Sequence, residues 1–153
     1  MIENTYNIHP ETIAIIPAYN MDYDSIVMET NATYYVHRTP LEIVQEACWH
    51  DWTTYDGRRK AVARRMGFQQ KTPIPINWQK DIYFFPTHSP KHMDNHWISL
   101  KHVVHFEKNT HKNSISIFLT NNQTIEVNMS LHTLEKQIQR TRACEFESNA
   151  LDL

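Results

Sequence analysis

The prolines constrain the fold of this chain more than any other residue type does. The sequence has 153 residues with seven prolines and only two glycines, which is not the composition of a flexible, low-complexity chain. Pro73 and Pro75 exclude a helix from residues 71–76, because proline lacks an N–H group and restricts the residue before it. Pro17 ends a β-branched, apolar run. We therefore expect a buried strand over 12–18 and an extended edge segment over 71–76.

Three helices are predicted from local signals. Thr39-Pro40-Leu41-Glu42 combines an N-cap, a proline at the first helical position and a capping-box glutamate. Asp56 and Gly67 can begin and end a second, short helix. The third helix is capped by Ser130, and its expected buried stripe consists of Leu131, Leu134 and Ile138.

Runs of β-branched and aromatic residues predict the remaining strands. They cover residues 25–30, 33–38, 81–87, 96–108, 114–120 and 124–129, after a polar and loose segment 1–11. Two pairs form hairpins, with Asn31 in the first turn and Asn121-Asn122 as left-handed residues of the second. The fold class is therefore α+β, with a largely antiparallel β-sheet and about three helices. We expect one domain over 12–143 and a short C-terminal tail over 144–153.

The second predicted helix concentrates positive charge. The segment Tyr55–Gly67 holds five of the fifteen Lys and Arg residues. At 100° per residue, Val62 and Met66 form its apolar stripe. Around that stripe, Arg58 and Arg65 lie along one edge, Arg59 lies along the other, and Lys60 and Arg64 point to solvent. Such a helix can bind a polyanion, or its charges can simply be solvated.

Charge is also segregated along the whole chain, although the net charge is only −2. Residues 1–56 carry nine acids and one base, and residues 57–142 carry fourteen bases and five acids. A basic middle segment beside an acidic start suggests nucleic acid on one face. The alternative is that the two segments neutralise each other in the fold.

The sequence offers little for catalysis. Gly57 and Gly67 are the only glycines, so there is no phosphate-binding glycine-rich loop. Cys48 and Cys144 lack metal-type spacing and are expected to be reduced, buried or half-buried thiols. We predict no enzyme, no catalytic residues and no cofactor.

Ten histidines raise the alternative of a metal site. His88, His92 and His96 repeat every four residues, which would align them on a helix, but Pro90 marks the run as a loop. His102 and His105 are expected on opposite sides of a strand. We therefore favour a polar loop with surface imidazoles and no metal.

No apolar run approaches the length of a membrane span, and the N-terminus lacks signal-peptide features. The expected location is the cytoplasm, at the nucleoid if the chain binds DNA.

The order of several short phrases resembles the ComK family, the competence transcription factors of Bacillus and its relatives. The most specific sequence motifs of this resemblance are Gly57-Arg58, Phe85-Pro86-Thr87 and Trp97-Ile98-Ser99. The resemblance covers the chain from about Thr12 to Arg142. From Trp97 to Ile138 the strand–hairpin–helix order also loosely resembles the LytTR DNA-binding domain. Longer ComK members continue for several dozen residues beyond the equivalent of Arg142. If that tail carries adaptor recognition, proteolytic control of this chain is in doubt.

The ComK resemblance implies an activator of DNA-uptake genes that binds paired A/T-rich boxes, largely through the minor groove. It also implies dimers that pair further, action with RNA polymerase, and removal by an adaptor-directed Clp protease. A basic helix suits phosphate contacts, and a narrow A-tract minor groove attracts arginine. The predicted DNA-binding residues are Arg58, Arg59, Lys60, Arg64, Arg65 and Lys71, with Arg58 and Arg59 at least partly exposed to solvent.

Two other readings stay open. The chain could be a non-enzymatic protein-interaction module driven by its charge segregation, or a metal-dependent enzyme built on the histidine loop. For the dimer expected from paired boxes, the segment around Ile74 and the last helix are both candidate interfaces.

Overall fold

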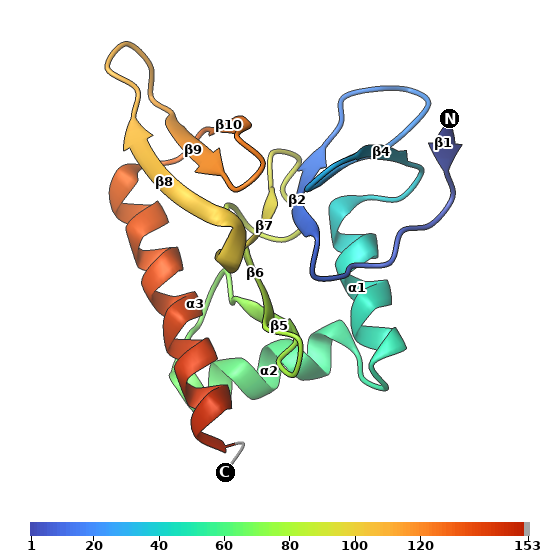
Figure 1. Ribbon diagram of the computed structural model, residues 1–153. Helices are drawn as coiled ribbons and strands as arrows, with labels where there is room; N and C mark the ends of the chain where they lie inside the picture. Colours follow the sequence, from blue (N-terminus) through green and yellow to red (C-terminus); the bar gives the residue numbers. More distant parts are fainter. Residues whose placement is uncertain (152–153) are drawn as a thin grey trace.

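The computed structural model describes residues 1–151, and it confirms an α+β fold with mostly antiparallel sheets and three helices (Figure 1). A seven-stranded sheet has the order β1-β4-β3-β2-β7-β6-β5, and a three-stranded sheet has the order β10-β9-β8. The seven strands are β1 (Ile2–Glu3), β2 (Thr12–Pro17), β3 (Ser25–Glu29), β4 (Thr33–Val36), β5 (Ile74–Asn77), β6 (Ile82–Pro86) and β7 (Trp97–Ser99). The others are β8 (Val103–Lys108), β9 (Ile115–Leu119) and β10 (Thr124–Val127).

The large sheet contains two antiparallel meanders. In the sequence, one meander precedes helices α1 and α2 and the other follows them. They meet where β2 pairs with β7, with Ala14 opposite Ile98 and Ile15 opposite Trp97. Strands 12–18, 25–30, 33–38 and 81–87 are thus confirmed within a residue or two. The helices must cross from one end of the sheet to the other to connect the meanders.

The predicted long strand 96–108 is wrong, because a 3₁₀ turn at Leu100–His102 divides it between the two sheets. His102 is buried at this turn, where its Nε2 lies 2.8 Å from the Pro10 carbonyl and its Nδ1 lies 2.6 Å from the Thr120 hydroxyl. The expectation of a surface imidazole on a strand face therefore fails for His102. The chain changes sheets here because these contacts fix the turn.

Local signals predicted the helices well. In α1 (Pro40–His50), Thr39 and Glu42 form the expected capping box. In α2 (Tyr55–Met66), the cap is Thr54 and not Asp56, since the Thr54 hydroxyl accepts the Gly57 N–H at 2.9 Å. Gly67 ends α2 in the left-handed conformation as predicted. No helix in the described part of the chain is long and apolar enough to cross a membrane.

Helix α3 (Leu131–Leu151) begins after Ser130, whose hydroxyl accepts the Thr133 N–H at 3.1 Å. Leu134 and Ile138 are buried as expected, and Leu131 is half-buried. The predicted tail 144–153 continues this helix as far as Leu151, and residues 152–153 lie outside the described part.

The strands of the large sheet alternate between two cores. On one face, Ile15, Phe84 and Trp97 pack against α1 through Ile43 and Val44. On the other face, a second cluster packs against the small sheet and α3; its fully buried members include Ile13, Phe85, Ile98, Ile117 and Leu134. Because side chains of a strand alternate between faces, neighbouring residues such as Phe84 and Phe85 serve different cores.

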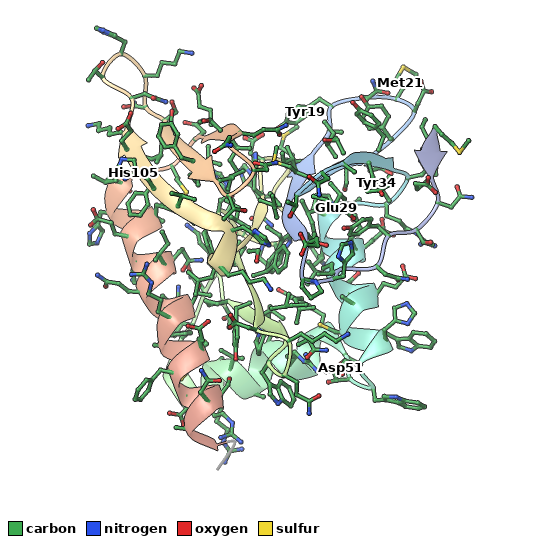
Figure 2. The ribbon with its side chains drawn as sticks, in the orientation of Figure 1. Tyr19, Met21, Glu29, Tyr34, Asp51 and His105 are labelled. Carbon is green, nitrogen blue, oxygen red and sulfur yellow. The ribbon has the colours of Figure 1, made fainter. Side chains whose placement is uncertain are left out.

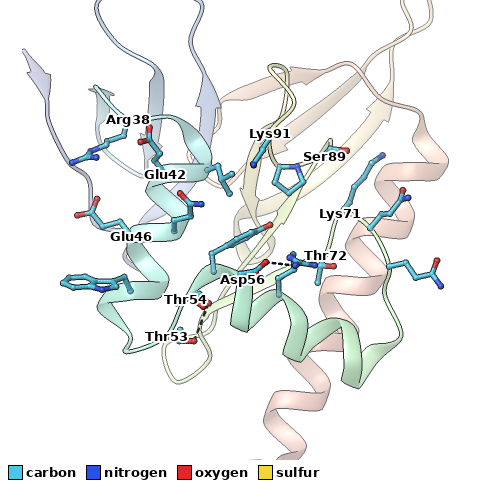
Figure 3. A pocket seen from close by; sticks show the side chains of 18 residues that line it. Arg38, Glu42, Glu46, Thr53, Thr54, Asp56, Lys71, Thr72, Ser89 and Lys91 are labelled. Atoms are coloured by element: carbon cyan, nitrogen blue, oxygen red, sulfur yellow. Dashed lines mark hydrogen bonds and ion pairs between the residues drawn. The ribbon is translucent and has the colours of Figure 1, made fainter.

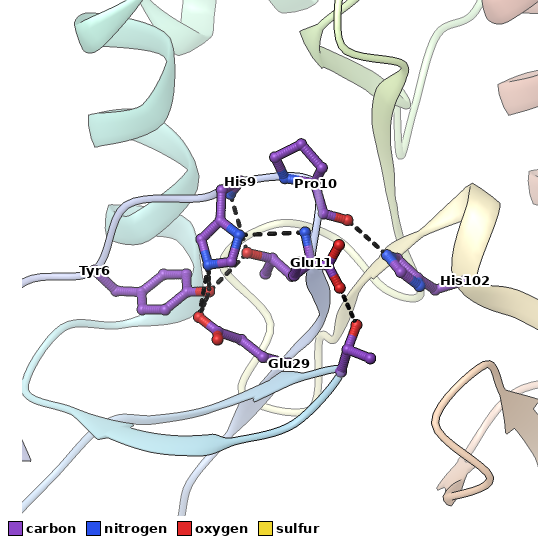
Figure 4. Close-up of polar contacts among 8 residues, drawn as sticks. Tyr6, His9, Pro10, Glu11, Glu29 and His102 are labelled. Atoms are coloured by element: carbon purple, nitrogen blue, oxygen red, sulfur yellow. Dashed lines mark hydrogen bonds and ion pairs between the residues drawn. The ribbon is translucent and has the colours of Figure 1, made fainter.

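The first eleven residues are held more firmly than the sequence predicted. β1 pairs in parallel with β4, and the Tyr6 ring is buried. The Tyr6 hydroxyl donates to Glu29 Oε2 at 2.5 Å and lies 2.6 Å from the Thr12 hydroxyl, while His9 Nε2 lies 2.7 Å from Glu29 (Figure 4). Burial, then the hydrogen bond to Glu29, raises the pKa of the Tyr6 phenol. This polar cluster fixes the segment on the sheet.

Near the end of α3, Glu145 lies beside Asp81 of the turn between β5 and β6. A hydrogen bond to Asp81, together with burial, raises the pKa of Glu145 to about 7. The pKa of Glu145 in the folded protein therefore lies above the ordinary value of a glutamate. The interaction of protonated Glu145 with Asp81 stabilises the fold fully below about pH 4.5, and this stabilisation is lost as pH rises to about 7.

We expect Glu145→Gln to abolish this fall in stability, because an amide can donate to Asp81 without titrating. Urea unfolding at about pH 5 and about pH 8 measures it, and the parent should lose stability between the two while the variant does not. An equal loss in both proteins would refute the shared proton.

Candidate nucleic-acid interface

An open cleft of about 1160 Å³ lies between α1, α2 and the loops that hold residues 69–72 and 89–91 (Figure 3). Its two sides differ in charge. Glu42 and Glu46 of α1 lie on one side, together with Arg38, and Lys71 and Lys91 lie across from them (Figure 3). Arg59 of α2 also lines the cleft. We call Arg59, Lys71 and Lys91 the basic wall.

The two acids on the α1 side of the cleft already interact with residues at the ends of α1. Glu42 accepts the Thr39 N–H at 2.9 Å in the capping box, and Glu46 lies 3.7 Å from His50. None of the cations predicted to bind DNA pairs with these two acids within the described residues. A polyanion would therefore approach the basic wall and be repelled by the side of α1.

Asp56, in the first turn of α2, holds two of the predicted cations. Its carboxylate lies 2.6 Å from Arg59 and 3.1 Å from Lys60, and these two hydrogen bonds hold the pKa of Asp56 below its ordinary value. Asp56 itself is well exposed, so the contacts are weak and can rearrange when a stronger anion arrives.

Arg58 does not face solvent, and that expectation is wrong. Its side chain is only 8% exposed, and its Nη1 donates to the carbonyls of Pro75 and Ile76 at 2.6 Å and 2.8 Å. Its Nη2 donates to Asp51 at 2.6 Å. Figure 2 shows Asp51 at the turn between α1 and α2. The guanidinium thus fastens α2 to the outer edge of β5, which explains the Gly57-Arg58 phrase without any DNA contact.

The same contacts bear on one candidate dimer interface. β5 is the edge strand that the prolines predicted, but Ile74 is fully buried and the carbonyls of Pro75 and Ile76 are already used. Two carbonyls of this segment are therefore already bonded to Arg58, and the segment around Ile74 stays a candidate interface.

The remaining cations of α2 are arranged as its helical spacing predicts. Arg58 and Arg65 line one hollow of about 670 Å³, and Arg59 lines the cleft on the other side. Lys60 and Arg64 are exposed between them. Arg64 and Arg65 form no ion pair with any described residue, so they are the cations best placed for a new anion. Four of the five predicted cations of α2 thus reach the surface.

Lys71 joins the basic wall from outside the helix. It adopts a left-handed backbone (φ 50°), and its carbonyl accepts the Gln137 side chain of α3 at 2.9 Å. Sequence analysis missed Lys91, which lies far away in the chain on a Ser-Pro loop. It also missed Trp49, which lines the cleft and is 71% exposed. No local pattern could place either of them beside α2.

The histidine run lies in a loop, as predicted. His88 and His92 stack with ring centroids 5.0 Å apart, and His88 is close to the Asn128 carbonyl at 3.0 Å. Burial lowers the pKa of His88 and of His96. Within residues 1–151, no group of three His, Cys, Asp or Glu side chains is placed to hold a metal ion.

Both cysteines are free and buried, as expected. Burial raises the pKa of Cys48 to about 11 and that of Cys144 to about 11. Neither thiol is a reactive nucleophile near neutral pH.

Comparisons with known proteins agree on one family. The family model described as ComK protein matches residues 3–151. The chain is 30% identical over 138 residues to a protein named competence transcription factor from Bacillus subtilis (strain 168), covering 90% of this chain and 71% of that protein. No solved structure matches the chain.

Proposed function

Because the chain belongs to the ComK family, we propose that it is a DNA-binding transcription regulator of competence genes without catalytic activity. The observation that carries the proposal is family membership across nearly the whole chain, including α2 and the basic wall. The exposed cations of α2 supply what the role needs, since phosphate contacts provide most of the affinity for DNA.

The proposed target is a pair of A/T-rich boxes read largely through the minor groove. Such grooves are narrow and strongly negative, and they favour inserted arginine over lysine. We assign the contacts to Arg59, Lys60, Arg64, Arg65 and Lys71, and add Lys91. Arg58 is withdrawn because its guanidinium is buried and fully engaged.

The proposed partners are double-stranded DNA, a second copy of the chain and RNA polymerase, with a Clp adaptor as a further candidate. No membrane is involved, and the proposed location is the cytoplasm at the nucleoid. A symmetric dimer would match paired boxes. The candidate interfaces are the segment around Ile74 and the last helix, and we favour α3, where Phe146 is 76% exposed.

The test is binding to a two-box A/T-rich duplex compared with a G/C-rich duplex of equal length and charge. We expect tighter binding to the A/T-rich duplex at every salt concentration, because equal phosphate contacts leave groove shape as the difference. Fluorescence anisotropy of end-labelled duplexes measures it. Equal affinities would refute the proposal.

The rival is a protein-interaction module driven by charge segregation, with the acidic α1 side of one copy against the basic α2 of another. The electrically divided cleft is compatible with it. Salt-dependent self-association together with no preference for A/T-rich DNA would favour this rival.

A further inference from the structure

We propose that the β8–β9 hairpin is a second DNA-contacting element, an inference that rests on the proposed function. The hairpin extends beyond the body of the protein, next to the start of α3 (Figure 1). Its loop contains Thr110-His111-Lys112-Asn113, and Lys108 is the last residue of β8 before the loop. We call these five residues the hairpin tip.

The hairpin tip has a rigid base. The Asn109 N–H donates to the Ser114 carbonyl at 3.0 Å, and the Asn109 side chain donates to the Ser114 hydroxyl at 2.7 Å. The Ser116 hydroxyl in turn donates to Asn109 Oδ1 at 2.8 Å. The loop therefore projects from a fixed platform, which reduces the entropy lost when it enters a groove.

The side chains of the hairpin tip can bind the phosphates and groove edges of a nucleic acid. Lys108, His111 and Lys112 are all exposed, and every other side chain of the tip carries a hydrogen-bonding group. Two acids lie beside these two lysines: Glu107 lies 3.4 Å from His105, and Glu126 lies 3.7 Å from Lys112. Lys108 has no ion pair with any described residue. A two-stranded ribbon of this kind fits a DNA groove.

The side of the hairpin that carries His105 adds an aromatic platform behind the tip. The rings of His105 and Phe118 stack with centroids 5.6 Å apart, and Figure 2 shows His105 on β8. The opposite side of the hairpin carries Ile115 and Ile117, which are buried in the second core. The hairpin thus stands on the body with one face free.

Helix α3 sets the distance between the two DNA-contacting elements. Leu131 at its start borders the same hollow as Lys108 and Asn113, and Glu147 near its end borders the same hollow as Arg65. The sixteen helical rises between Leu131 and Glu147 span about 24 Å at about 1.5 Å each, and the hairpin projects further. A spacing of about 34 Å corresponds to one turn of B-DNA. We therefore expect the hairpin tip to contact DNA about one turn away from α2 when both elements bind one duplex.

Directed cleavage tests this placement, and the buried native thiols make it specific. A cysteine introduced by His111→Cys is exposed, whereas Cys48 and Cys144 are buried with raised pKa values and should not be labelled. The label is an iron chelate that cuts DNA, and Ala61→Cys on α2 provides the reference position. We expect His111→Cys to cut about 10 base pairs from the cuts of Ala61→Cys. Met21→Cys, at an exposed loop, is the control and should not cut.

Binding of matched double variants gives the second readout. Lys108→Ala with Lys112→Ala should weaken binding and lower the salt slope by about two units, since about one is lost per phosphate contact. Lys80→Ala with Lys101→Ala removes the same charge elsewhere and should leave the slope unchanged. Equal losses in both double variants, or no cleavage from position 111 while the parent still prefers A/T-rich DNA, would overturn this inference alone. A parent protein without that preference would overturn the proposed function as well.

Discussion

Arg58→Ala is expected to lower the free energy of unfolding by about 3 kcal/mol. The change leaves two buried carbonyls, those of Pro75 and Ile76, without their charged donor, at about 1–3 kcal/mol each. It also leaves Asp51 without its partner, although Asp51 is 41% exposed and can be solvated. Urea unfolding followed by circular dichroism measures the loss.

Two variants control for this expectation. Arg64→Ala removes an equal charge from the exposed side of α2 and should change stability by less than about 0.5 kcal/mol. Arg58→Lys keeps the charge but cannot reach both carbonyls and Asp51 with one ammonium, so its loss should be intermediate. If Arg58→Ala unfolded like the parent and bound DNA more weakly, Arg58 would be a DNA contact and its structural assignment would be wrong.

Arg64→Ala combined with Arg65→Ala is expected to weaken DNA binding most among variants that keep the fold. Both side chains are exposed without a described acidic partner, and alanine is a good helix former. If both contact phosphates, the slope of log K against log salt should fall by about two units. Anisotropy titrations between about 50 and about 200 mM salt measure this slope.

The lysine versions of the same two positions separate phosphate contacts from groove contacts. Arg64→Lys with Arg65→Lys should keep nearly the parent salt slope, because lysine can also neutralise a phosphate. Its preference for A/T-rich over G/C-rich DNA should fall if either arginine enters a narrow groove. Parent-like affinity and slope in the alanine double variant would show that Arg64 and Arg65 do not contact DNA.

The geometry of Arg58 shows where sequence reasoning reaches its limit. Its place on the edge of the apolar stripe of α2 follows from helical spacing alone, and this prediction is confirmed. What lies against that edge does not follow from spacing. β5 supplies two free carbonyls there because it is the last strand of the sheet and its pairing with β6 is irregular between Pro75 and Asn77. Arg58 is buried because it lies against these carbonyls. An arginine at the same helical position would be a candidate DNA contact if that side of α2 faced solvent.

By itself the sequence determined the elements whose causes are local. The Thr39–Glu42 capping box, the left-handed Gly67 that ends α2, and the strands that end at or contain prolines all depend on residues within a few positions of one another. Only the tertiary structure decided the division of 96–108 between two sheets, the burial of Arg58 and the placement of Lys71 and Lys91 along the same cleft. Each of these depends on contacts between segments far apart in the chain, and local backbone preference carries no information about which distant groups will be neighbours.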